Sequence, residues 1–220
     1  MSVQPGELAQ IYDRRFQGRL EYRNRVWRVL IDDFFQQFIP AQATVLDLGC
    51  GYGEFINNIG CGTKLAMDLN PVAAGGLSPQ VKFLRQDCAA RWPLEDGSLD
   101  VIFTSNFFEH LPDKPALGRT LDECRRCLKG GGRLLSLGPN IKYLPGLYWD
   151  FWDHHLPLTE TALREALETR DYYVERCVGK FLPYTMAHGW QYPLICVRLY
   201  LRFKPAWRVF GRQFLLIARK

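Results

Sequence analysis

Short apolar runs recur along the chain from residue 44 onward, and polar or glycine-containing segments separate them. Runs of this kind predict strands, whereas apolar residues spaced three and four apart predict helices. Strands are predicted at 44–48, 64–68, 81–85, 100–105, 133–137, 172–178 and 213–218, and helices at about 112–128 and 159–168. Strands that alternate with helices predict an α/β fold, in which a parallel sheet carries helices on both faces.

A long helical pattern precedes the first predicted strand, over residues 7–38. Apolar side chains recur at every fourth position from Val26 to Phe38, which is the spacing of one helix face. Pro40 ends the segment. The expected organisation is a helical cap of residues 1–40, with Tyr12 and Phe16 as lid contacts, on one domain of residues 41–220.

The first predicted strand runs into a glycine-rich turn, Gly49-Cys50-Gly51-Tyr52-Gly53. Glycines at such a turn permit tight backbone geometry and the close approach of a ligand. The helix that follows offers unpaired N–H groups at the same point, so a nucleotide-like cofactor fits here. A dinucleotide fingerprint has the spacing G-x-G-x-x-G, and the spacing G-x-G-x-G therefore disfavours a nicotinamide cofactor and an oxidoreductase.

Three acidic residues accompany the predicted strands. Asp68 ends the second strand, and an ionised carboxylate has two acceptor oxygens that suit the two hydroxyls of a ribose. Asp87 follows the third strand, where it could accept from an adenine amino group. Asp47 stands two residues before the first glycine and would either contact the cofactor or cap the turn.

With these motifs the sequence resembles the class I S-adenosylmethionine-dependent methyltransferases, over about residues 43–178 and 213–220. It is similar to the small-molecule group that includes the quinone-biosynthesis methyltransferases. Segments 93–101, 105–111 and 128–133 resemble the family's lead into strand four, its post-strand segment and its turn before strand five.

The resemblance implies a Rossmann-like, seven-stranded, mostly parallel sheet of order 3-2-1-4-5-7-6 with the last strand antiparallel. It implies S-adenosyl-L-methionine as the methyl donor, whose methyl group is already activated, so that positioning supplies much of the catalysis. It assigns cofactor contacts to Asp47, Gly49, Cys50, Gly51, Gly53, Asp68, Leu69, Asp87, Cys88 and Asn106.

Three histidines are candidate catalytic bases on the acceptor side. His110 follows the fourth predicted strand, where a role in holding the loop is an equal alternative. His154 and His155 belong to an aromatic segment, 143–157, and His155 could instead stabilise the start of the following helix. Together with Asp150 and Asp153 they could suggest a metal cluster, but consecutive residues on a loop define no coordination geometry, and no metal is expected.

The segment after the fourth strand also bears on the acceptor. Enzymes that methylate nucleobase or glutamine nitrogen usually carry an Asn/Asp-Pro-Pro-aromatic motif there. This chain has Asn106-Phe107-Phe108 instead, which disfavours those acceptors.

Charge is distributed unevenly in this chain of net charge +5. From Arg176 to Lys220 there are nine Lys or Arg and no Asp or Glu, so the positive excess lies in this part. An insertion at about 179–211 is aromatic as well as basic, and residues 192–212 could lie in the interface of an anionic membrane. A lid or a dimer contact is the alternative. Nucleic acid is an unlikely partner, because no recognised nucleic-acid module is present.

The seven cysteines and the apolar runs bear on the compartment. An odd number of cysteines does not suit a disulfide framework, and Cys124-x-x-Cys127 lacks the second pair that a zinc site usually needs. No apolar run approaches the ~18 residues of a membrane span, and the first residues lack a secretory pattern. We expect a cytoplasmic methyltransferase that acts on a small-molecule or lipid-linked acceptor. The alternative is a protein that binds S-adenosylmethionine without catalysis, as a regulatory or interaction subunit.

Overall fold

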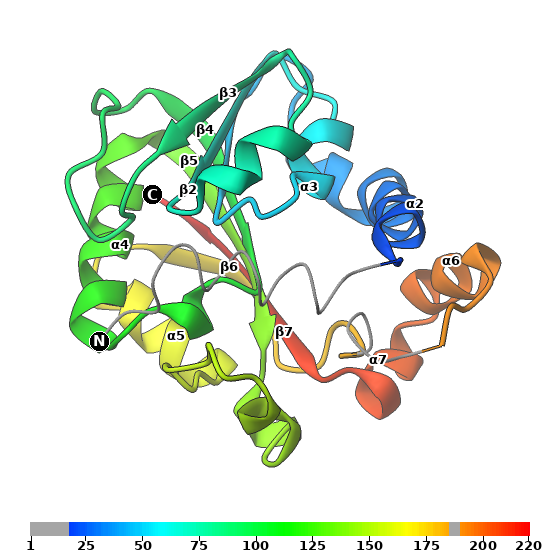
Figure 1. Ribbon diagram of the computed structural model, residues 1–220. Coiled ribbons are helices and arrows are strands. Elements are labelled where there is room, and N and C mark those ends of the chain that lie inside the picture. The colour runs from blue at the N-terminus through cyan, green and yellow to red at the C-terminus, as the bar shows by residue number, and fades with distance from the viewer. Residues whose placement is uncertain (1–17, 185–189) are drawn as a thin grey trace.

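A single seven-stranded sheet organises the computed structural model, which describes residues 18–184 and 190–220 (Figure 1). The expected contacts of Tyr12 and Phe16 lie outside the described residues. The strand order is β3-β2-β1-β4-β5-β7-β6, and β7 is antiparallel to both of its neighbours while the remaining pairs are parallel. The predicted order and the antiparallel last strand are therefore confirmed. The strands are β1 Thr44–Leu48, β2 Thr63–Asp68, β3 Val81–Arg85, β4 Leu99–Ser105, β5 Leu128–Pro139, β6 Tyr173–Val178 and β7 Gln213–Arg219.

Helices cover both faces of the sheet, as Figure 1 shows. One face carries α2 (Leu20–Leu30) and α3 (Glu54–Asn58), and the other carries α4 (Lys114–Cys127) and α5 (Glu160–Glu168). Two further helices, α6 (Leu194–Arg202) and α7 (Lys204–Phe210), lie beyond the sheet on the side of α2. The structure is thus a three-layer α/β sandwich.

Alternation along the strands divides the apolar core in two. Phe103 of β4 faces α2 and α3, whereas its neighbour Ile102 faces α4 and α5, as the period of two in a strand requires. Behind Phe103, the ring of Phe55 stacks at a centroid distance of 3.6 Å, and Trp27 of α2 meets it edge-on at 5.9 Å. These aromatic contacts fix α2 against the sheet.

Two helices on the opposite face begin at side-chain caps. Asp113 Oδ1 accepts a hydrogen bond from the backbone N–H of Ala116 (2.7 Å), and Thr159 Oγ1 accepts one from Ala162 (3.1 Å). Such caps satisfy backbone donors that have no partner within the helix. They explain why α4 and α5 start within two residues of the predicted positions.

Some boundaries differ from the sequence-based expectation. The fifth strand begins at Leu128 and not at Arg133, because Leu128 pairs with Leu99 before residues 129–132 bulge out of register. The N-terminal helical segment is not one α-helix in its described part, since a π turn (Ile31–Phe35) and a 3-10 turn (Gln36–Phe38) follow α2.

The insertion at 179–211 contains α6 and α7 in its described part. Trp207 of α7 anchors the pair, because its Nε1 donates to the carbonyl of Tyr200 (2.9 Å) and its ring meets Phe181 edge-on at 4.9 Å. Tyr200 in turn donates its hydroxyl hydrogen to the Phe181 carbonyl (2.6 Å). Among the described residues, no helix has the length and apolar character needed to cross a bilayer.

Candidate active site

The glycine turn lies at the carboxyl end of β1, near the centre of the sheet. Gly49, Gly51 and Gly53 have φ angles of +71°, +52° and +76°, which side chains with a Cβ rarely adopt. The backbone N–H of Gly49 donates to the Met67 carbonyl (2.9 Å) and thereby ties the turn to β2. The turn therefore requires glycine for its conformation.

Asp68 joins the ends of β1 and β2. Its Oδ2 accepts the N–H of Gly51 (3.0 Å) and its Oδ1 accepts the N–H of Asn70 (2.9 Å). Burial raises the pKa of Asp68, and these two N–H groups oppose that rise. Each oxygen keeps a lone pair, so the carboxylate can still accept two hydroxyl groups.

Asp47 lies under the turn and is 3% exposed. Burial raises its pKa well above the ordinary value, and the nearby charge of Glu54 adds to the rise, while a hydrogen bond from the Ile56 backbone opposes it. The contact with Ile56 directs Asp47 toward the first turn of α3. Cys50 is buried beside it, and burial raises the pKa of that thiol as well.

Asp87 and Cys88 begin the loop between β3 and β4. The side chain of Asp87 is exposed and its Oδ1 accepts the N–H of Ala89 (2.9 Å). The Cys88 thiol is buried and accepts from the hydroxyl of Thr120 (3.5 Å), and burial raises its pKa to about 11. The loop thus presents one exposed carboxylate beside a fixed, protonated thiol. Leu69 belongs to another loop, directly after β2, and is 43% exposed.

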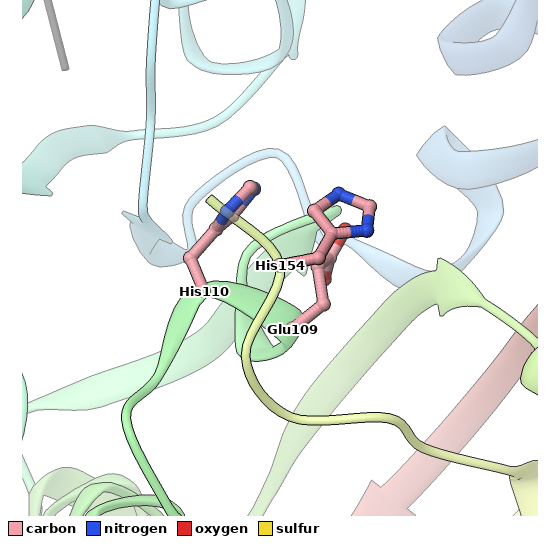
Figure 2. A group of neighbouring side chains, drawn as sticks. All are labelled: Glu109, His110 and His154. Atoms are coloured by element: carbon pink, nitrogen blue, oxygen red, sulfur yellow. The ribbon is translucent and has the colours of Figure 1, made fainter. Parts of the chain in front are cut away.

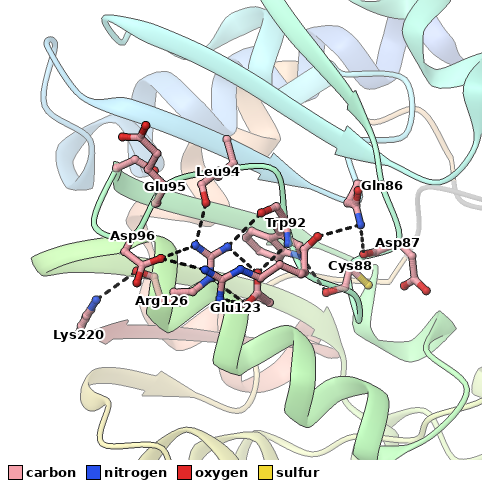
Figure 3. A network of polar contacts seen from close by, with 12 residues as sticks. Gln86, Asp87, Cys88, Trp92, Leu94, Glu95, Asp96, Glu123, Arg126 and Lys220 are labelled. Atoms are coloured by element: carbon pink, nitrogen blue, oxygen red, sulfur yellow. Dashed lines mark hydrogen bonds and ion pairs between the residues drawn. The ribbon is translucent and has the colours of Figure 1, made fainter.

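A guanidinium on α4 holds this loop in place, as Figure 3 shows. Arg126 Nη1 donates to the Leu94 carbonyl (2.8 Å), and its Nε and Nη2 donate to the two carboxylate oxygens of Glu123 (2.9 and 2.7 Å). Glu123 also accepts the N–H of Trp92 (2.8 Å), whose indole N–H donates to the Cys88 carbonyl (2.9 Å). This network, which sequence reasoning missed, connects α4 to the residues around Asp87.

The segment after β4 lies over the glycine turn. Asn106 has a φ of +50°, its N–H donates to the Leu137 carbonyl (2.9 Å), and its buried Oδ1 has no hydrogen-bond partner among the described residues. The ring of Phe107 lies directly on Gly49, since a Cβ on that glycine would be 2.3 Å from the ring. Phe107 was not predicted as a site residue, although its place after strand four was a usable signal.

Two of the three predicted histidines meet beside this segment. His110 and His154 have ring centroids 5.0 Å apart, and His154 is 6% exposed. The Nδ1 of His110 lies 2.8 Å from the Asp153 carbonyl oxygen and 3.4 Å from Asp153 Oδ2. His155 is adjacent in sequence, but its side chain is exposed.

Aromatic side chains of segment 143–157 enclose His154. The ring of Phe151 stacks on it at 4.9 Å, and that of Tyr148 lies 4.7 Å away on another side. Phe151 also meets Tyr184 edge-on at 5.7 Å. The site therefore combines a glycine turn with acidic acceptors on one side and an aromatic wall with histidines on the other.

The residues present fit a cofactor with a ribose and an adenine ring. Asp68 lies beside the glycine turn, and Asn106 Oδ1 is a buried acceptor with no described partner. Acceptor oxygens at the ends of β1 and β2 match the usual ligand position in an α/β sheet, outside the carboxyl ends of the strands.

A solved structure shares the fold over the whole chain. A methyltransferase of Haloferax volcanii, solved in a complex with the Trm112 methyltransferase activator, matches with a TM-score of 0.69 and 21% identity. The match covers 99% of each chain. At this identity the likeness concerns the fold alone.

Two curated relatives match part of the sequence, and both are named probable S-adenosylmethionine-dependent methyltransferase. The protein of Mycobacterium tuberculosis is 34% identical over 108 residues, which are 46% of this chain and 38% of the relative. That of Mycolicibacterium smegmatis is 32% identical over 143 residues, which are 62% of this chain and 54% of the relative. The matched regions thus span about half or less of these relatives. The profile of a methyltransferase domain family matches residues 19–176, and the chain therefore belongs to the methyltransferase domain family.

Proposed function

We propose that the protein is an S-adenosylmethionine-dependent methyltransferase that acts on a small-molecule or lipid-linked acceptor. The observation that carries the proposal is the junction of β1 and β2, where three glycines in the left-handed region meet Asp68 through the Gly51 N–H. Membership in the methyltransferase domain family and the names of the curated relatives support it.

Asp68 would bind the ribose hydroxyls through the lone pairs that its two backbone contacts leave available. Asp87 and Cys88 would adjoin the adenine ring, and the turn residues with Asp47, Leu69 and Asn106 would complete the cofactor site. When bound, the cofactor supplies a methyl group on a sulfonium centre. The protein then has to orient the acceptor and exclude water, which positioning by rigid elements can achieve. Residues 1–40 would form a cap over this site, and the 2.7 Å ion pair of Arg23 with Glu54 supports this by fixing α2 to the start of α3.

His110 and His154 are the candidates for removing a proton from the acceptor. The contact of His110 Nδ1 with the Asp153 carbonyl places the ring proton on Nδ1, which leaves Nε2 as the basic nitrogen. His154 is buried among the rings of Tyr148 and Phe151. His155 remains a candidate with an exposed side chain.

Calorimetric titration with S-adenosylmethionine and S-adenosylhomocysteine tests the cofactor assignment, with NADH as the control ligand. We expect binding of the first two to be lost in Asp68→Ala. Asp122→Ala is a matched control, because this carboxylate pairs with Arg170 on the surface of α4. Unchanged binding in Asp68→Ala would refute the assignment, and binding without turnover of any acceptor would favour a non-catalytic subunit.

The surface of α6 supports the lipid-linked part of the proposal. Ile195 and Leu199 lie four positions apart on one face of α6, and Phe203 directly follows the helix; the three side chains are 59%, 59% and 63% exposed and form an apolar stripe. Arg198 and Arg202 are exposed on the same helix. An exposed apolar stripe beside cations suits the interface of an anionic membrane. A cytoplasmic protein that binds the membrane surface in this peripheral way would meet lipid-linked acceptors.

Flotation with vesicles tests this part of the proposal. The protein should float with phosphatidylcholine vesicles that contain phosphatidylglycerol, and less with phosphatidylcholine alone. Binding should fall in the double variant Ile195→Ser, Leu199→Ser but not in Tyr173→Ser, which removes an equally exposed ring from β6. If the double variant instead dissociates a dimer and leaves flotation unchanged, the stripe is a contact between copies of the chain.

A further inference from the structure

Glu109, His110 and His154 form a cluster, of which the function proposed above uses only the two histidines, as candidate bases that a bound metal ion would replace in that role. Glu109 and His110 lie on the 3-10 turn Phe108–His110 after β4, and His154 comes from the segment that links β5 to α5. One potential ligand atom from each residue lies within 4.8 Å of the other two. Figure 2 shows the segment with His154 crossing the turn that carries the other two side chains. Side chains more than forty positions apart in sequence thus converge on one point.

Backbone hydrogen bonds hold the two segments together. The Glu109 carbonyl accepts the N–H groups of both His155 (2.8 Å) and Leu156 (3.0 Å). The N–H of His154 donates to the Phe151 carbonyl (3.2 Å). The convergence of the three side chains therefore does not depend on contacts between the side chains themselves.

The two imidazole rings are held in defined orientations. His110 Nδ1 lies 2.8 Å from the Asp153 carbonyl oxygen, which fixes the tautomer and leaves Nε2 as a ligand atom. A carbonyl or carboxylate behind the distal ring nitrogen is the usual arrangement around histidines that bind metals. The ring of His154 stacks on Phe151 at 4.9 Å. Both rings are therefore preorganised in a way that loop histidines in water are not.

The donor set has a definite preference among metals. Two neutral imidazoles and one carboxylate suit Zn²⁺ and neighbouring transition metals, whereas Mg²⁺ and Ca²⁺ prefer oxygen ligands. A tetrahedral ion with ligands at about 2.1 Å holds them about 3.4 Å apart. The present separations of up to 4.8 Å would therefore have to shorten by as much as about 1.4 Å. Three protein ligands leave a coordination position open, as in catalytic zinc sites.

We propose that Glu109, His110 and His154 bind a divalent transition-metal ion of the Zn²⁺ class. No metal was expected from the sequence, because the candidates there, Asp150, Asp153, His154 and His155, are neighbours in the chain. Of those four, only His154 supplies a ligand atom here, while the side chains of Asp150 and His155 are exposed. The proposed ligands are different residues from the glycines and the Asp68 of the proposed cofactor site.

Metal binding is measured on the full chain without a histidine tag, after treatment with a chelator. Equilibrium dialysis with Zn²⁺ followed by elemental analysis should give one equivalent, and Co²⁺ should give the visible absorption of a site with nitrogen ligands. Glu109→Gln and His154→Ala should each weaken binding by roughly 100-fold or more, beyond the 10- to 100-fold effect of outer-sphere changes. His155→Ala is the matched control, because it removes an adjacent exposed histidine, and should change the affinity by less than about twofold.

Several results would overturn the proposal. These are less than stoichiometric Zn²⁺ in the wild-type chain, or equal affinity in Glu109→Gln and the wild type, or a larger loss in His155→Ala than in His154→Ala. If a variant fails to fold, the Co²⁺ spectrum of the wild-type chain decides, since a spectrum of aqueous Co²⁺ excludes the site. Calorimetry with S-adenosylmethionine on the chelator-treated chain keeps this outcome distinct from the cofactor assignment.

Discussion

The Arg126–Glu123 pair offers a quantitative test of how α4 supports the cofactor side of the site. We consider Arg126→Met, which retains much of the aliphatic chain but removes the guanidinium. The wild-type guanidinium contacts both oxygens of Glu123 and also the carbonyls of Leu94 (2.8 Å) and Trp92 (3.2 Å). The variant therefore removes the guanidinium donor from two carbonyl groups and from a carboxylate that keeps the N–H of Trp92.

The expected cost follows from burial. The side chains of Arg126 and Glu123 are 11% and 14% exposed. Removing one member of a buried ion pair costs about 3–5 kcal/mol, and the residual contact with water places this pair at the lower end, about 3 kcal/mol. For a domain of this size, that corresponds to a fall of about 6–12 °C in Tm. The contact with the exposed Asp96 adds little.

Urea denaturation measures the loss of stability, and calorimetry measures the cofactor affinity. The Kd for S-adenosylmethionine should rise by about threefold to tenfold, because the loop that carries Asp87 loses its anchor on α4. Arg125→Met is the matched control, since Arg125 is the preceding residue on the helix and pairs with the exposed Asp171. It should cost less than about 1 kcal/mol. Equal losses of unfolding free energy in the two variants would refute this reasoning. So would a loss of about 3 kcal/mol in Arg126→Met with an unchanged Kd for S-adenosylmethionine.

Three further predictions concern the glycine turn, the pH dependence and the core. Gly49→Ala should abolish S-adenosylmethionine binding in calorimetry, because the new Cβ would meet the Phe107 ring at 2.3 Å. Gly131 also has a positive φ (+79°) but has open space around it. Gly131→Ala should therefore lower the free energy of unfolding by only about 1–2 kcal/mol and leave binding intact. Hydrogen bonds from Arg126 lower the pKa of Glu123 below its ordinary value of 4.5. The ion pair therefore stabilises the fold fully above pH 4.5 and less as the pH falls below that value. The difference in the free energy of unfolding between the wild type and Arg126→Met, measured in urea, should accordingly become smaller below pH 4.5. Phe103→Ala should cost about 3–5 kcal/mol in the same assay, since this ring is 1% exposed, and a cost under about 1 kcal/mol would contradict the packing described.

Most of the fold could be predicted because its signals are local. The predicted strand 81–85 coincides with β3, and the one at 64–68 misses only Thr63 of β2. Period-two alternation and the glycine turn act over a few residues, so the sequence alone carries them. The start of β5 was missed because a bulge at 129–132 keeps glycines inside a strand, and only the pairing partner Leu99 defines that register.

The cofactor side of the site could likewise be predicted only where its signals are local. Asp68 was predicted from its place at the end of a strand, and the structure brings it to the Gly51 N–H. The network of Arg126 was missed, because its partners on the loop lie some thirty positions away in sequence and no local pattern connects them.

The sequence by itself determined the order of strands and helices, the glycine turn, the acids at the strand ends and the basic, aromatic character of the last part of the chain. Only the tertiary structure decided which histidines meet and which side chain contacts the turn. His154 lies beside Glu109 and His110 while its neighbour His155 is exposed, and Phe107 covers Gly49. The physical reason is that local patterns specify elements, whereas contacts between distant segments depend on how the packed core and its backbone hydrogen bonds set the path of each loop.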